Sequence, residues 1–237
     1  MPETIRVTRV DAHPIWGACV FLEAQSEDGE AVRTAYAEAA PDWPPLHFAV
    51  SPATPAALDP WYRLGFAQMH AYGAMPSRVE AFEVPGVQLR AGSVEDLETA
   101  MQIDLLIHRA QAEPPSYSSA PYAAAEHRAT WLETLEAEDV AYVVAERDGR
   151  PVGHATLYPD ATDDDALHLA STAVVPEERG SGVGRLLTAF ALTHAADGGF
   201  ARLKTNWRVT NLTASRYWPA RGFELTHIRL VRRIPDL

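Results

Sequence analysis

The sequence predicts an α/β fold, and three observations carry that prediction. Apolar runs of strand length alternate with segments of helical periodicity along most of the chain. The run over residues 167–175 leads through a glycine-rich turn into an apolar-periodic helix. Residues 55–70 match residues 212–227 at a constant offset of 157 positions, which indicates an internal repeat.

Composition limits the classes of protein that the chain can belong to. It has 237 residues, 47% of them hydrophobic, which is enough for one large or two small globular domains. The apolar runs are short, and residues 1–6 do not resemble a signal peptide, so we expect a cytoplasmic protein without a membrane span. The single cysteine, Cys19, excludes an intramolecular disulfide and is interpreted as a buried apolar residue. The net charge of −12 argues against a nucleic-acid partner.

Residues 1–84 are predicted to form an N-terminal domain. Its expected elements are strands over 5–7, 18–22 and 46–50, a turn over 26–30, and a helix after residue 55 that ends in Gly65-Phe66. At the offset of 157, Trp61 falls on Trp218, and Gly65-Phe66 falls on Gly222-Phe223. A chance match between two short helix-Gly-Phe segments is the alternative to a repeat.

Residues 85–237 are predicted to form a C-terminal domain. Pro85-Gly86 marks its start, and Ser93 is the expected N-cap of its first helix. We expect an irregular loop over 112–122, a second helix over 123–137, and a hairpin that turns at 147–150. The last strand, over 228–233, is either paired within the sheet or exposed as an edge, which leaves a homodimer possible.

The glycine-rich turn predicts an anion site. Gly180, Gly182 and Gly184 allow backbone conformations closed to other residues and let a ligand approach the main chain. The N–H groups of the turn and of the first helical turn point into one concave site, where the helix dipole adds positive potential. Arg179 and Arg185 add positive charge, so the expected guest is a phosphate or pyrophosphate. The spacing fits neither the dinucleotide fingerprint nor a Walker loop.

Two motifs together resemble the GCN5-related N-acetyltransferase (GNAT) superfamily. Arg179-x-x-Gly182-x-Gly184, preceded by V-x-P and followed by R-L-L, resembles its acetyl-CoA pyrophosphate loop. A strand, Asn211, a short helix and Gly222-Phe223 follow in family order and at family spacing. The resemblance implies a mixed, strongly twisted sheet of the acyl-CoA N-acyltransferase type. It also implies a tandem arrangement, in which residues 1–84 are a reduced copy that lacks the loop and cannot hold CoA.

The resemblance also implies which residues form the site. Main-chain groups of Thr172, Ala173 and Val174 would hold the pantetheine arm of acetyl-CoA, and Asn211 would contact the cofactor, cap its helix, or do both. The pyrophosphate would bind the loop residues Arg179, Gly180, Ser181, Gly182, Val183 and Gly184. Tyr117 and Tyr122 lie in the loop that walls the acceptor pocket in the family, the alternative being a solvated linker with two aromatic plugs.

The residues for proton transfer depart from the family pattern. Trp218 stands where many members carry a tyrosine that reaches the CoA sulfur, and tryptophan cannot exchange a useful proton. Tyr217 is therefore the candidate acid, unless the thiolate leaves unprotonated. Asn206 stands where some members have a glutamate base, which leaves His168 as candidate base against a structural role for it. The histidines are scattered, without H-x-x-x-H or cysteine partners, so no metal site is predicted.

These motifs predict direct transfer of an acetyl group from acetyl-CoA to a primary amine of a small molecule or a peptide. The negative charge of the chain favours a cationic amine acceptor. Trp218 and Asn206, which replace groups that are often catalytic, also leave open a non-catalytic module that binds or senses acetyl-CoA. Transfer of a longer acyl group is a third possibility.

Overall fold

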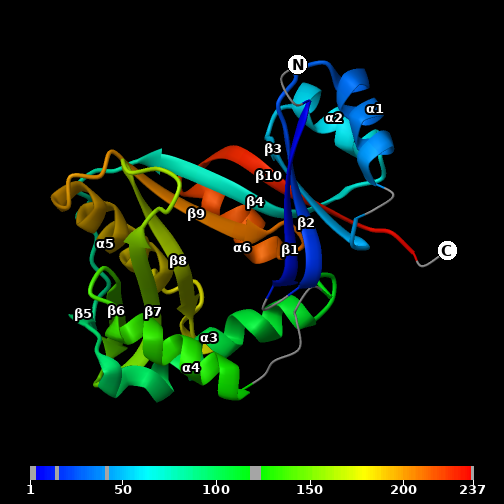
Figure 1. Cartoon of the computed structure of the whole chain (residues 1–237). Coiled ribbons are helices and arrows are strands. Elements are labelled where there is room, and N and C mark those ends of the chain that lie inside the picture. The colour runs from blue at the N-terminus through cyan, green and yellow to red at the C-terminus, as the bar shows by residue number, and fades with distance from the viewer. Residues whose placement is uncertain (1–3, 14–15, 41–42, 118–123, 236–237) are drawn as a thin grey trace. The chain divides into compact units, whose positions relative to one another are not determined.

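The computed structural model describes residues 4–13, 16–40, 43–117 and 124–235. The chain divides into two compact units (Figure 1). The first unit joins residues 1–73 to residues 207–237, and the second unit spans residues 74–206. The chain passes from the first unit to the second within β4 (Ala67–Pro76) and returns within β9 (Arg202–Arg208). None of the described helices is long and apolar enough to cross a membrane.

The second unit is built on β9 and four further strands. They are β5 (Val87–Ala91), β6 (Ala141–Arg147), β7 (Arg150–Pro159) and β8 (Ala166–Val174), in the spatial order β9-β8-β7-β6-β5. The pairs from β5 to β8 are antiparallel, whereas β8 and β9 are parallel, so the sheet is mixed as expected. The helices of this unit are α3 (Leu97–Ala112), α4 (Ala124–Glu136) and α5 (Val183–Asp197).

Local sequence signals set several of these boundaries. Ser93 and Asp96 form a reciprocal capping box at the short 3-10 turn η2 (Val94–Asp96), which leads into α3. Asp148 and Gly149 both have positive φ, as the tight turn between β6 and β7 requires. Leu97 and Ala100 of α3 pack with Trp131 of α4 and with residues of β6 in one buried cluster. This cluster fixes α3 and α4 against the sheet.

The first unit contains the remaining strands. These are β1 (Ile5–His13), β2 (Gly17–Ala24), β3 (Leu46–Pro52), β10 (Glu224–Arg233) and β4, in the spatial order β1-β2-β3-β10-β4. β10 pairs antiparallel with β3 from His227 to Arg233, so it lies inside the sheet and the exposed-edge alternative for residues 228–233 is wrong. Cys19 of β2 is fully buried beside Leu46 and Phe48, in agreement with its interpretation as an apolar core residue.

The described residues of the first unit form three helices: α1 (Gly29–Ala39), α2 (Pro55–Arg63) and α6 (Leu212–Ala220). The expected turn over residues 26–30 is wrong in part, because α1 begins there at Gly29. The Asp28 side chain accepts hydrogen bonds from the backbone N–H groups of Glu30 and Ala31 and so starts the helix. Only Val32 and Tyr36 of α1 are buried, which left little apolar periodicity to detect.

The segments matched at an offset of 157 have the same geometry. The bounds of α2 and α6, and those of β4 and β10, differ by 157 positions at both ends. The rings of Trp61 and Phe66 lie 5.2 Å apart at 72°, and those of Trp218 and Phe223 lie 5.2 Å apart at 78°. Gly65 and Gly222 both have positive φ. The match therefore extends from sequence to structure, and descent from a duplicated domain is our proposal for its origin.

Candidate active site

A bulge in β8 opens one edge of that strand. In the pairing with β7, Leu157 faces Leu169 and Thr156 faces Ser171, so Ala170 is an extra residue in β8. The parallel pairing with β9 extends only as far as Leu169. Beyond the bulge, residues 171–174 keep β7 as their neighbour but have no pairing with β9. The main-chain groups on that edge are therefore available to an extended ligand.

The glycine-rich turn leaves the N-terminus of α5 without a cap. Gly182 is the N-cap residue, has a φ of 100°, and has no side chain to accept from the first helical N–H groups. The N–H groups of Arg179 and Ser181 are used within the turn, where they donate to the carbonyls of Pro176 and Glu178. The first turn of α5 thus presents donors and the positive end of its dipole to an anion.

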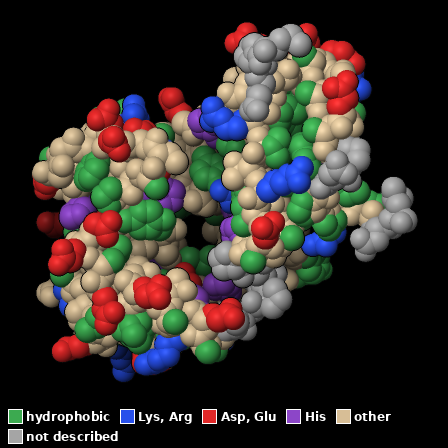
Figure 2. Space-filling model, viewed as in Figure 1, with side chains coloured by type: hydrophobic (Ala, Val, Ile, Leu, Met, Phe, Trp, Pro, Cys, Tyr) green, Lys and Arg blue, Asp and Glu red, His purple; other side chains and the backbone are tan. Residues whose placement is uncertain are grey.

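Basic side chains reinforce this site in an acidic protein. Figure 2 shows acidic side chains spread over the visible face of the molecule. At the turn, Arg147 neutralises Glu178 through bonds of 2.7 and 3.1 Å, and its hydrogen bonds lower the pKa of that carboxyl. Arg185 stacks over the Phe82 ring at 4.1 Å. Among the described residues, neither Arg179 nor Arg185 has a carboxylate partner, so the positive charge of both is available to a ligand.

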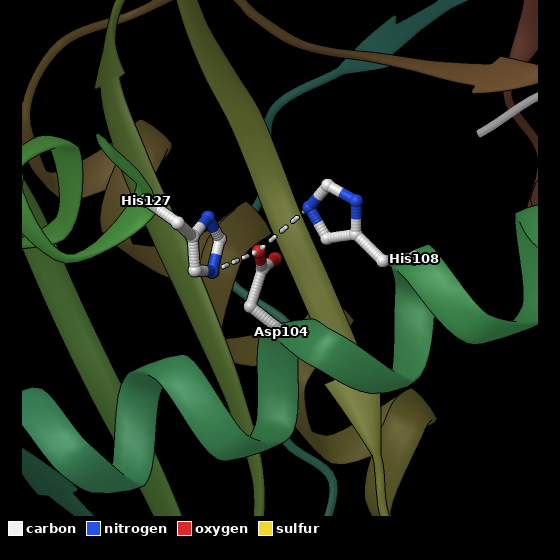
Figure 3. A group of neighbouring side chains, drawn as sticks. All are labelled: Asp104, His108 and His127. Atoms are coloured by element: carbon white, nitrogen blue, oxygen red, sulfur yellow. Dashed lines mark ion pairs between the residues drawn. The ribbon is translucent and has the colours of Figure 1, made fainter. Parts of the chain in front are cut away.

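A cluster of polar side chains lies between α3 and α4 (Figure 3). Asp104 and His108 come from α3, and His127 comes from α4. The Oδ2 atom of Asp104 lies 3.3 Å from His127 Nε2 and 3.6 Å from His108 Nε2, with the two imidazoles on either side of the carboxylate. The side chains of Asp104 and His127 are each 13% exposed. The cluster is therefore mostly removed from water.

Hydrogen bonds connect this cluster to β8. Ser171 Oγ donates to Asp104 Oδ1 at 2.9 Å and lies 3.3 Å from His154 Nε2. Because the hydroxyl has one proton, His154 must donate through Nε2 and accept at Nδ1 from the Tyr142 hydroxyl, 3.3 Å away. Burial lowers the pKa of His154 to about 4, so it is neutral, and burial raises the pKa of Tyr142. The chain of bonds runs from Tyr142 through His154 and Ser171 to Asp104.

The cluster can act in two ways. Its three side chains each offer one ligand atom, all within 4.8 Å of one another, so they could hold a metal ion. They can also accept a proton. Burial lowers the pKa of His127, and His108 lowers it further, while Asp104 opposes the shift. A neutral imidazole oriented by a carboxylate is a suitable proton acceptor near pH 7.

Sequence reasoning missed this cluster. The spacing D-x-x-x-H places Asp104 and His108 on one face of a helix, and that spacing could have been noticed. His127 comes from a different helix and joins them only through tertiary packing.

His168, the candidate base, lies on the paired half of β8, before the bulge. It is buried, its Nε2 atom is 3.1 Å from Asn206 Nδ2, and its Nδ1 atom is 3.5 Å from Asp160 Oδ2. It also stacks on Tyr158. Burial is the main cause of its lowered pKa. Because Asn206 lies at hydrogen-bond distance from Nε2 and the Asp160 carboxylate faces Nδ1, these contacts favour the structural alternative. Catalysis by His168 stays a prediction.

The other predicted residues are divided between the units. The second unit brings together Thr172, Ala173 and Val174 with the loop residues from Arg179 to Gly184. Asn211 and Tyr217 belong to the first unit, where Asn211 accepts from the backbone N–H of Ala214 at 3.2 Å and caps α6 as expected. Tyr217 lies edge-on to Trp218. Tyr117 is 75% exposed beyond the end of α3, and Tyr122 lies outside the described residues.

Comparisons with known proteins agree with this geometry. The family model described as "Acetyltransferase (GNAT) family" matches residues 104–223, a span that includes the polar cluster, the loop and α6. Mycothiol acetyltransferase from Kocuria rhizophila is 32% identical over 78 residues, which are 32% of this chain and 26% of that enzyme. The matched segment is thus about a quarter of that relative's length.

Two solved structures share the fold across most of this chain. A GCN5-related N-acetyltransferase from Sphaerobacter thermophilus aligns with a TM-score of 0.65 and 13% identity, over 99% of this chain and 79% of that one. Another from Kribbella flavida aligns with a TM-score of 0.56 and 20% identity, over 95% and 89%. The expected α/β fold and family are confirmed. This chain belongs to the acetyltransferase (GNAT) family.

Proposed function

We propose that the enzyme transfers an acetyl group from acetyl-CoA to a primary amine of a small molecule or a peptide. The observation that carries this proposal is the uncapped, positively charged N-terminus of α5 in the same unit as the open edge of β8. The pyrophosphate of acetyl-CoA would bind the N–H groups of the loop and of the first turn of α5. The pantetheine arm would lie along Thr172, Ala173 and Val174, and no metal is required.

The reaction is a direct substitution at the thioester. The neutral amine attacks the carbonyl carbon, the C–N bond forms, and the C–S bond breaks to release CoA as a thiolate. The nitrogen loses one proton to solvent or to the departing thiolate, which leaves a neutral amide. The main chain of β8 beside the thioester stabilises the oxyanion that develops. Tyr217 is the proposed acid for the thiolate, although a thiolate can also leave unprotonated, since thiols ionise near pH 8.5.

His127 is the proposed acceptor of the proton that the ammonium form of the substrate must lose. Its lowered pKa keeps it neutral, and Asp104 stabilises the imidazolium once the proton has moved. Ser171 connects Asp104 to the strand that would hold the thioester. The buried bonds from Tyr142 and His154 hold Ser171 in place, so the acceptor is fixed relative to β8.

One observation supports a cationic acceptor. The chain carries 32 acidic residues against 20 basic ones, a charge that attracts cations. The relative from Kocuria rhizophila, named as a mycothiol acetyltransferase, supports an acetyl group as the group transferred.

Assays with a panel of primary amines test the proposed acetyl transfer. They measure release of the CoA thiol and the mass of the acetylated product. We expect turnover in the wild type and a loss of about 10²–10⁴-fold in kcat for His127→Gln and for Asp104→Asn. Asp164→Asn, an exposed carboxylate outside the cluster, is the control and should keep full activity. Acetyl-CoA binding without turnover on any amine would instead support a sensing module, and preference for a longer acyl-CoA would change the donor.

A further inference from the structure

Several buried polar groups of the first unit lack partners. Arg208 ends β9, Thr210 follows it, His70 lies in β4, and Arg229 lies in the neighbouring strand β10. Arg208 is only 8% exposed. Its Nη1 atom has no hydrogen-bond partner, and the same holds for Arg229 Nε, His70 Nδ1 and Thr210 Oγ1. Unused donors of this number at one place are unusual for the interior of a protein.

Two of the unpaired groups, those of Arg208 and Arg229, carry positive charge. Burial, and then the charge of Arg229, lower the pKa of Arg208 to about 10, so Arg208 stays protonated at neutral pH. Burial and the two arginines lower the pKa of His70 to about 3, so His70 is neutral. Among the described residues, no carboxylate pairs with Arg208 or Arg229, although acidic residues outnumber basic ones in this chain. A buried charge without a counter-charge is strongly destabilising.

Aromatic rings flank both guanidinium groups. Arg208 lies over the Trp16 ring at 5.4 Å, and Arg229 lies near the Tyr72 and Phe21 rings at 5.5 and 5.8 Å. Cation–π contacts of this kind compensate only part of the cost of burying an arginine. The rings also supply flat, apolar surface next to the charge. An anion with a planar apolar body matches both features.

We propose that the first unit binds a small organic carboxylate whose acid group pairs with Arg208 and Arg229. A planar carboxylate accepts two parallel N–H bonds from a guanidinium, and Arg208 has an unused N–H group for this purpose. A phosphate would need more donors than the surrounding aromatic faces provide. The proposal does not depend on acyl transfer, because none of these residues belongs to the loop, to β8 or to the polar cluster of the second unit.

Calorimetric titration of sodium benzoate into the full chain, with chloride holding the ionic strength constant, tests the ligand class. We expect benzoate to bind the wild type and to bind Arg208→Met at least about tenfold more weakly. Arg9 is an exposed arginine of β1 that pairs with no carboxylate of the described residues, and Arg9→Met should bind benzoate like the wild type. Tighter binding of inorganic phosphate than of benzoate would overturn the assignment to a carboxylate. If Arg208→Met and Arg9→Met weakened benzoate binding equally, the placement of the site at Arg208 would be wrong.

Thermal unfolding without ligand provides a second, independent readout. If Arg208 lacks a counter-charge in the free protein, Arg208→Met should unfold at the same temperature as the wild type or higher. Benzoate should raise the unfolding temperature of the wild type and leave that of the variant unchanged. A lower unfolding temperature for Arg208→Met, together with no response of the wild type to benzoate, would show that Arg208 is already satisfied within the fold. Acetyl-CoA binding should be the same in both proteins.

Discussion

Two strand-to-helix turns in this molecule differ at the residue that caps the helix. β2 leads into α1 and then into the parallel strand β3, just as β8 leads into α5 and then into β9. The Asp28 carboxylate accepts from the first N–H groups of α1, at 3.0 and 3.3 Å. Gly182 leaves the corresponding groups of α5 open. The Asp28 carboxylate therefore occupies the N-terminus of α1, whereas the N-terminus of α5 is open to the phosphate of a ligand.

The two turns also differ in the helices and strands that come before them in the chain. In the described residues of the first unit, the hairpin β1–β2 corresponds to β7–β8, and no helices correspond to α3 and α4. Asp104, His108 and His127 all come from that helix pair. In the proposed repeat, the strand–helix–strand scaffold therefore occurs twice, whereas the proposed phosphate site and the proposed proton acceptor occur only once among the described residues.

The largest effect should come from the packing that both copies share. Trp61→Ala and Trp218→Ala each remove a buried ring that packs edge-on against a phenylalanine, and each should lower the free energy of unfolding by about 3–5 kcal/mol. Urea denaturation measures both, with the exposed Leu212→Ala as control. A large loss for one tryptophan and almost none for the other would break the structural equivalence of α2 and α6.

Gly182→Asp makes the second turn resemble the first. The new carboxylate would lie at the N-terminus of α5 and repel phosphate, and its Cβ would lie 3.2 Å from Val84 Cγ2, so we expect acetyl-CoA affinity to fall at least about a hundredfold, measured by calorimetry. Gly199→Asp is the control for the strain of a positive φ, because Gly199 has a φ of +80° at the other end of the same helix and space for a Cβ. It should cost about 1–2 kcal/mol of stability and leave affinity unchanged. Equal affinity in the two variants would mean that the turn does not bind the cofactor.

The pH dependence of kcat/KM tests the proton acceptor of the second unit. His127 must be neutral to accept a proton, and its pKa is lowered from 6.5, so activity should fall only when the pH drops below that value. Asp104 raises the pKa of His127, and therefore Asp104→Asn should move this acidic limb to still lower pH while reducing the maximal rate. An unmoved limb would exclude His127 as the titrating group.

The smallest effect is expected at the cap of the first turn. Asp28→Ala removes two hydrogen bonds to α1 and should cost about 1 kcal/mol of stability, seen as a small decrease in the midpoint of urea denaturation. Acetyl-CoA binding should not change. Weaker acetyl-CoA binding in this variant would mean that the first turn contributes to the cofactor site.

Much of the fold and the glycine-rich turn could be predicted because local signals encode them. Proline, glycine and cap residues such as Pro176, Gly182 and Asn211 mark boundaries by their own conformational preferences. α1 was missed because only Val32 and Tyr36 face the core. Tertiary clusters could not be predicted. His127 meets Asp104 only because α4 packs on α3. Arg208 of β9 and Arg229 of β10 come into one region only because both strands flank β4.

The stoichiometry of acetyl-CoA binding tests the central comparison most directly. Calorimetric titration into the full wild-type chain should give one site per chain, because α5 is the only helix of the described residues with an open N-terminus behind a glycine-rich turn. Two sites would show that Asp28 does not exclude the cofactor from the first turn. No binding by the folded protein would contradict the assignment of the second turn as the acetyl-CoA site, and with it the proposed reaction.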